Sequence, residues 1–193
     1  VLEYLDAVQA DVIDNADEFR RGEGESDGEP TRASEFHRYV VNVLIDAGAE
    51  VNRYAADVTR TVPVNGRFSP EQREVYRIVR EAQAAAERTV KPGSSFQAWR
   101  DAAQAVVARG VARLGLTEGV DATFDPPWAE QCEANPVACT QAFLYMAHGL
   151  GHGIGLEVHD RPHPWYGTGT FAEGDVFTIE PGVYISTRLL DIL

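Results

Sequence analysis

The spacing of hydrophobic and polar residues changes along the chain and predicts a series of different elements. Apolar residues recur at roughly helical spacing from Leu2 to Phe19, so we expect a helix over residues 1–22. Glycine, proline and acidic residues at 21–32 are typical of a linker. The β-rich run at 39–47 predicts a buried strand. After a turn or bulge at Gly48, residues 49–64 continue with strand character.

Two amphipathic helices are predicted in the middle of the chain. The first begins at Ser69-Pro70-Glu71-Gln72, which has a capping serine and a proline at the first helical position, and its apolar face continues to about residue 90. Residues 91–93 break the pattern. A second helix then starts at Ser94 or Ser95 and runs to about residue 114, where Gly115 is a suitable C-cap. Residues 117–140 are loop-like, and 175–180 predict a final strand.

Residues 148–160, HGLGHGIGLEVHD, contain three histidines and four glycines. The pair His148 and His152 could share a face of a helix, as in zinc proteases. Each interior glycine, however, would cost a helix about 1 kcal/mol relative to alanine. The glycines alternate with apolar residues, so the segment is better described as an extended strand with His148 and His152 on one face and His159 on the other. Its bare glycine face would allow a metal or substrate to approach closely.

Composition narrows the class of protein. The chain has 193 residues, 44% hydrophobic, and 17 basic against 30 acidic residues give a net charge of −13. No basic patch for nucleic acid stands out, no apolar run is long enough for a membrane span, and residues 1–6 do not resemble a signal peptide. We therefore expect a cytoplasmic protein with no nucleic-acid or membrane partner. Cys132 and Cys139 have six residues between them, and a local disulfide and two free thiols both fit this spacing.

Three carboxylates stand at the ends of predicted strands, where acids need partners. Asp46 and Asp57 each follow apolar residues, and the two acids are eleven positions apart, a spacing that suits a hairpin. Glu180 stands at the end of the last predicted strand. Each acid alone could be a turn cap or an ion-pair partner of Arg53 or Arg60. Together with a histidine they form a ligand set that suits manganese, cobalt, iron or zinc. Two such ions can share and activate one water molecule.

These residues resemble a known family. The segments DAGAE (46–50), YAADVTRT (54–61), the histidine segment and EPGVY (180–184) are similar to the metallopeptidases of family M24, with the pita-bread fold, a group that includes methionine aminopeptidase, aminopeptidase P, prolidase and creatinase. The segment PVNGRFSPEQ (63–72) resembles the proline-specific branch. The resemblance spans about residues 40–186. It implies an α+β fold with a curved antiparallel sheet and helices on its outer face, truncated at both ends, with a linker segment 1–36 and a partial catalytic domain 37–193.

The resemblance also implies roles for individual residues. Asp46, Asp57, His152 and Glu180 would bind two divalent ions, Mn²⁺ or else Co²⁺ or Zn²⁺, and Glu180 would also handle the proton of the activated water. His148 and His159 would bind the substrate and assist catalysis, whereas His163 would have at most a minor role on the substrate side. The implied reaction is hydrolysis of the Xaa-Pro bond at the N-terminus of peptides, by a homodimer.

Two features of the family pattern have no counterpart here. Relatives carry a further glutamate ligand in a later strand, but the sequence ends at Leu193, and Asp191 lacks the setting of that ligand. They also carry a histidine well upstream of the first aspartate, whereas His37 stands only nine residues before Asp46. The alternatives are therefore a catalytically inactive peptide-binding module, a creatinase-like amidinohydrolase or, less compatible with the motifs, a methionine aminopeptidase.

Overall fold

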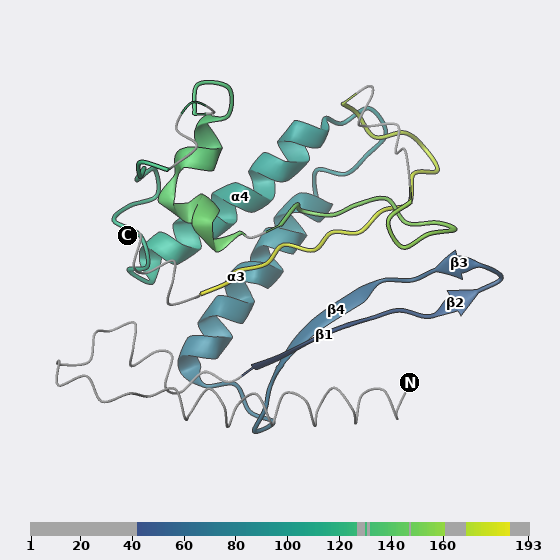
Figure 1. Ribbon diagram of the computed structural model, residues 1–193, viewed down its shortest axis with the longest axis horizontal. Helices are drawn as coiled ribbons and strands as arrows, with labels where there is room; N and C mark the ends of the chain where they lie inside the picture. Colours follow the sequence, from purple (N-terminus) through teal and green to yellow (C-terminus); the bar gives the residue numbers. More distant parts are fainter. Residues whose placement is uncertain (1–41, 127–129, 131, 147, 161–168, 186–193) are drawn as a thin grey trace. The chain divides into compact units, whose positions relative to one another are not determined.

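The computed structural model describes residues 42–126, 130, 132–146, 148–160 and 169–185 (Figure 1). The described elements combine helices and strands, as an α+β fold requires. The chain divides into two compact units, one with residues 1–46 and 59–72 and the other with residues 47–58 and 73–193. The predicted helix at 1–22, the linker, and the predicted domain boundary after residue 36 lie outside the described residues.

In the first unit, strand β1 (Asn42–Ala47) pairs with β4 (Val58–Pro63), and the start of helix α3 (Pro70–Glu87) follows. The helix begins at the predicted residue because Ser69 and Gln72 cap each other. The Gln72 amide donates to Ser69 Oγ at 3.2 Å, and the Ser69 amide donates to Gln72 Oε1 at 2.7 Å. Hydrogen bonds from the backbone N–H of Glu71 and from the Ser69 hydroxyl lower the pKa of Glu71.

In the second unit, a hairpin lies between Asp46 and Asp57, as their spacing indicated, and its turn interrupts the strand character predicted for residues 49–64. Strands β2 (Glu50–Val51) and β3 (Tyr54–Ala55) pair antiparallel around a two-residue turn. Asn52 and Arg53 in this turn have φ of 54° and 71°, as a tight hairpin requires. Gly48 lies against the other strand, and a Cβ there would overlap the carbonyl oxygen of Ala56. The strand is interrupted at residues 48 and 49, where a turn or bulge was predicted, and the backbones approach closely there.

The core of the second unit lies between α3 and α4 (Phe96–Arg113), which lie side by side (Figure 1). Ser95 caps α4 by accepting from the amide of Ala98 at 2.9 Å. At the other end Gly115 has φ of 71° and Leu116 N–H donates to the Val111 carbonyl, which is a Schellman ending. The helices cross at Gly110, where a Cβ would overlap the side chain of Ile78. Helix α3 ends at Glu87, slightly before the predicted residue 90, and α4 has the predicted bounds.

Two extended segments cover this pair of helices, drawn in green and yellow in Figure 1. Residues 150–154 and 176–180 run antiparallel, with the amides of Ile154, Thr178 and Glu180 donating to the carbonyls of Val176, His152 and Leu150. Phe177 and Ile179 pack against the helical core, whereas Thr178 and Glu180 alternate with them. The strand predicted at 175–180 is therefore present as an extended, paired segment, with its apolar residues directed to the helices.

The connection between α4 and the histidine segment has more structure than the predicted loop. It contains two short 3-10 helices, η2 (Pro136–Cys139) and η3 (Gln141–Tyr145). Cys132 and Cys139 form a disulfide with a Cα–Cα distance of 5.7 Å, which decides between the two alternatives left open above. Tyr145 is fully buried, and its hydroxyl donates to the Leu116 carbonyl at 2.6 Å. Burial raises the pKa of Tyr145. No helix in the described part of the chain is long and apolar enough to cross a bilayer.

Candidate metal centre

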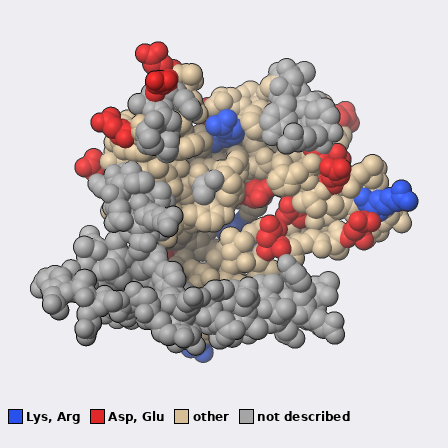
Figure 2. Space-filling view, viewed as in Figure 1, with Lys and Arg blue, Asp and Glu red and all other residues tan. Residues whose placement is uncertain are grey.

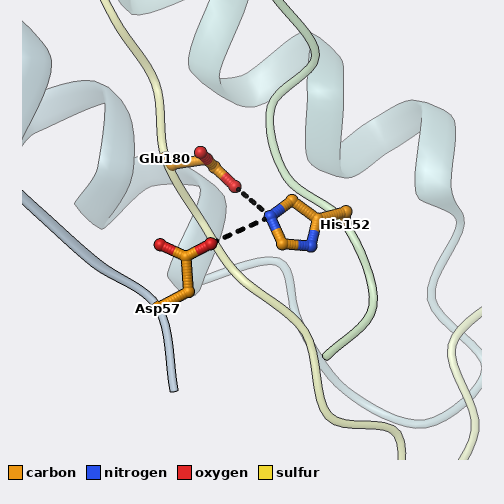
Figure 3. A group of neighbouring side chains, drawn as sticks. All are labelled: Asp57, His152 and Glu180. Carbon is orange, nitrogen blue, oxygen red and sulfur yellow. Dashed lines mark ion pairs between the residues drawn. The ribbon is translucent and has the colours of Figure 1, made fainter. Parts of the chain in front are cut away.

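Three of the predicted ligands converge in the second unit. His152 Nε2 lies 3.2 Å from Asp57 Oδ2 and 3.0 Å from Glu180 Oε1 (Figure 3). One ligand atom from each residue lies within 4.8 Å of the others. Within the described residues this is the only such group of three or more potential ligands. The side chains of Asp57 and His152 are 9% and 14% exposed, so water screens their interaction only weakly.

Each ligand comes from a different segment of the second unit. Asp57 follows the β2–β3 hairpin, which the Ala55 amide ties to the Gly155 carbonyl at 2.8 Å. His152 and Glu180 belong to the two paired extended segments. The hydrogen bonds that join these segments set the backbone positions of both residues. The site therefore depends on backbone pairing between parts of the chain that are about a hundred residues apart.

The orientation of the His152 ring favours cation binding. Its Nδ1 lies 3.0 Å from the Gly153 carbonyl oxygen. When the neutral ring donates from Nδ1 to this carbonyl, Nε2 carries the lone pair, and it points at two carboxylate oxygens. Three electron-pair donors directed at one point repel one another unless a cation lies between them. A nitrogen and two carboxylate oxygens form the donor set that Mn²⁺, Co²⁺ or Zn²⁺ accepts, so the residues fit a divalent ion.

Glu180 is held by neighbours that the sequence analysis did not identify. The Thr178 hydroxyl donates to Glu180 Oε1 at 2.6 Å and accepts from the His152 amide at 2.9 Å. From α3, the Gln83 side-chain amide donates to the Ile179 carbonyl at 2.7 Å. Thr178 therefore joins two ligand segments, while Gln83 attaches the Glu180 segment to the helix. Side chains alternate between the two faces of an extended chain, so Thr178 lies on the same face as Glu180, and this alternation was the sequence signal that could have identified Thr178.

The histidine segment does not remain extended to residue 160, and this corrects the predicted position of His159. The chain bends after Gly155, with the Asp160 amide donating to the Gly153 carbonyl at 3.0 Å. As a result, His159 stacks on His152, with 3.7 Å between ring centroids and 17° between ring planes. Strict alternation had placed the two rings on opposite faces, and that expectation was wrong. The resemblance to the family, which placed His159 near the site, agrees with the observed stacking.

Two glycines of this segment allow close packing within the protein, whereas the prediction was that they leave room for a metal or substrate. A Cβ on Gly151 would overlap the Thr178 carbonyl oxygen, and one on Gly155 would overlap the Asp160 carboxylate. Protein atoms, not a metal or substrate, therefore occupy the space beside these two glycines. By contrast, a Cβ on Gly149 would meet nothing within 4 Å.

His148 lies on the exposed side of the segment and is paired with Tyr184. Its Nε2 lies 2.7 Å from the Tyr184 hydroxyl, and its Nδ1 lies 2.7 Å from the Gly149 carbonyl oxygen. Gly182 makes this pair possible, since a Cβ there would approach the tyrosine ring and His148 Nε2 too closely. Tyr184 is a further residue to which the sequence pattern assigned no role.

Asp46 is the one described residue among the remaining predictions, and the group of three does not include it. Asp46 lies in β1, in the first unit, and its assignment as a ligand stays a prediction. His37 and His163 lie outside the described residues. Figure 2 shows acidic side chains spread over one face of the molecule, with few basic ones, in line with the net charge of −13. Such a field attracts cations in general and does not by itself identify a site.

Comparison with known proteins identifies the family to which this chain belongs. Residues 30–190 match the sequence model of metallopeptidase family M24. A probable Xaa-Pro aminopeptidase of Paracoccidioides lutzii is 34% identical over 163 residues, which are 78% of this chain and 32% of the relative. The Xaa-Pro aminopeptidase of Haemophilus influenzae is 41% identical over 146 residues, which are 75% of this chain and 31% of that protein.

Solved structures show the same relationship. Zinc-substituted Escherichia coli aminopeptidase P in complex with product has 36% sequence identity and a TM-score of 0.59, over 75% of this chain and 30% of that one. Pseudomonas aeruginosa aminopeptidase PepP has 34% identity and a TM-score of 0.59, over 77% and 32% of the two chains. The chain thus spans about a third of the length of these relatives. The predicted pita-bread fold is confirmed, and the chain belongs to metallopeptidase family M24.

Proposed function

We propose that this chain is part of a metal-dependent aminopeptidase that hydrolyses the Xaa-Pro bond at the N-terminus of peptides. The observation that carries the proposal is the convergence of Asp57, His152 and Glu180 within 4.8 Å, beside the stacked ring of His159. The relatives named Xaa-Pro aminopeptidase support the substrate class.

In the proposed site, Asp57, His152 and Glu180 would hold divalent metal, and Mn²⁺ is the ion we expect. The assignment of Asp46 as a further ligand rests on the resemblance to the family. When bound, divalent ions polarise a carbonyl and activate water. Because Glu180 Oε1 is fixed by the Thr178 hydroxyl, its second oxygen is available to accept and return a proton.

The histidines are assigned to the substrate. His148 and its partner Tyr184 lie at the exposed side of the segment, where the Tyr184 hydroxyl can turn from the imidazole and donate to a peptide carbonyl. The stacked ring of His159 is exposed, and it can donate a hydrogen bond to the oxygen on which negative charge develops. We further propose a homodimer with peptide substrates, no nucleic-acid partner and a cytoplasmic location.

The experiment is hydrolysis of Ala-Pro-Ala by the full-length protein, measured as released alanine. We expect release with Mn²⁺, loss of activity after chelation, and recovery when metal is returned. Glu180→Gln should lower kcat/KM by about a hundredfold or more, because both a ligand and a proton acceptor are lost. Glu173→Gln is the matched control, since Glu173 is an exposed acid near the same extended segment and should leave the rate unchanged.

Folded protein that releases no alanine with Mn²⁺, Co²⁺ or Zn²⁺ would contradict the proposal. Binding of the peptide without hydrolysis would instead identify an inactive peptide-binding module. Hydrolysis of creatine in place of peptides would identify an amidinohydrolase.

A further inference from the structure

A half-open cavity of about 360 Å³ adjoins the histidine segment in the second unit. It lies between the first half of α4 and residues 143–146 and 148–151, and its wall includes His148, Gly149 and Gly151. The volume falls in the range of small-molecule sites. Gly151, on the wall of the cavity, is bonded directly to the candidate ligand His152, so the cavity adjoins the segment that contributes this ligand.

Arg100 is the only arginine or lysine among the described residues on the wall of this cavity. Arg100 comes from α4 and is partly buried, and its guanidinium makes no hydrogen bond or ion pair within the described part of the chain. This is unusual in a chain with 30 acidic and 17 basic residues. The neighbouring acid, Asp101, instead accepts a hydrogen bond from Gln97. A guanidinium presents a planar set of donors that matches a carboxylate.

The rest of the lining has a mixed character that suits a peptide. Four apolar side chains form most of the wall, from Phe96, Phe143, Met146 and Leu150. Polar groups stand at Asn135 and Gln104. Asn135 belongs to the loop closed by the Cys132–Cys139 disulfide, so a covalent bond limits the movement of this side of the cavity.

We infer that this cavity binds the part of the substrate that follows the scissile bond, with Arg100 binding the C-terminal carboxylate of a short peptide. The inference rests on the proposed function. A guanidinium repels the free α-ammonium group at the start of a peptide and attracts the carboxylate at its end, which determines the direction of the bound chain. Short peptides with a free carboxylate are then preferred over amidated or longer ones, and the apolar wall accepts the side chain near the C-terminus.

The test compares Xaa-Pro peptides of two to four residues, each as the free acid and as the C-terminal amide. For peptides of equal length, we expect the full-length protein to hydrolyse the free acid with a kcat/KM about tenfold higher than that of the amide. One charged hydrogen-bonded contact contributes a factor of this size. Arg100→Met should remove this preference without changing the rate on the amide. Arg100→Lys should keep part of it. The control is Arg109→Met, an exposed arginine on the opposite side of α4 that should behave as the wild type.

A second arm separates this inference from the proposed function. Calorimetry on the metal-free protein measures binding of Pro-Ala and of its amide, independently of catalysis. Tighter binding of the acid, lost in Arg100→Met, supports the subsite even if no peptide is hydrolysed. Equal binding of acid and amide by the wild type, or an acid preference that Arg100→Met retains, would overturn it.

Discussion

One hydroxyl group determines how Glu180 is oriented. Thr178 donates to the carboxylate and accepts from the His152 amide, and so connects two residues of the ligand cluster. That Thr178 shares a face with Glu180 follows from the alternation of an extended chain and was predictable. Its contact with His152 was not, because it requires two segments separated by 26 positions to pair in one register.

Replacing Thr178 by valine tests this role at the residue scale. Valine has nearly the same shape but no hydroxyl, so Glu180 loses a donor and the His152 amide loses its acceptor. We expect affinity for Mn²⁺ to fall about tenfold, as for other groups that orient metal ligands, with kcat reduced and KM little changed. Calorimetric titration and steady-state kinetics measure these values. Thr178→Ser should restore them.

The control is Thr89→Val, which removes a hydroxyl that donates to Ala86 at the end of α3, away from the three ligands. An unchanged Mn²⁺ affinity and kcat in Thr178→Val would show that Thr178 does not orient Glu180.

At the scale of elements, local capping and long-range pairing differ in how far they could be predicted. The start of α3 and both ends of α4 agree with the sequence analysis, because Ser69, Ser95 and Gly115 act on backbone groups within a few residues. The bend of the histidine segment was missed. It depends on a hydrogen bond from Asp160 back to Gly153, which competes with the extended form that the alternation predicts.

Two glycines of the histidine segment provide a test of pairing at this scale. Gly151 lies against the Thr178 backbone, so a methyl group there must push the two paired segments apart. We expect Gly151→Ala to lower the free energy of unfolding by about 1–3 kcal/mol and to weaken Mn²⁺ binding. Gly149→Ala is the matched control, since its methyl group would meet nothing within 4 Å. Urea unfolding and metal titration give both values, and equal behaviour of the two variants would contradict the observed packing.

At the scale of the whole molecule, the disulfide is a covalent link between two cysteines that the sequence alone could not identify as paired or free. Cys132 and Cys139 close a loop of eight residues. Two cysteines at this spacing can be paired or free, and only their Cα–Cα distance of 5.7 Å shows that a bond fits without moving the backbone.

Removing the disulfide by the double change Cys132→Ser and Cys139→Ser should lower the free energy of unfolding by about 2–3 kcal/mol, from the loop-closure entropy of so short a loop. Urea unfolding with and without dithiothreitol is the measurement. The reductant should destabilise the wild type and leave the double variant unaffected. Alkylation before cell lysis tests the proposed location as well, because a cytoplasm keeps such thiols reduced, and recovery of the disulfide would argue against it.

The sequence by itself determined the family, the two helices with their caps, and three ligands that the structure brings together. These features depend on residue type and on short spacings, which a linear pattern contains. Tertiary structure alone decided the positions of His159, Thr178 and Tyr184, the backbone contacts of Gly48 and Gly151, and the cavity beside Arg100. Each of these arises where distant segments meet, and the register and bend that bring them together are set by packing and backbone hydrogen bonding across the fold.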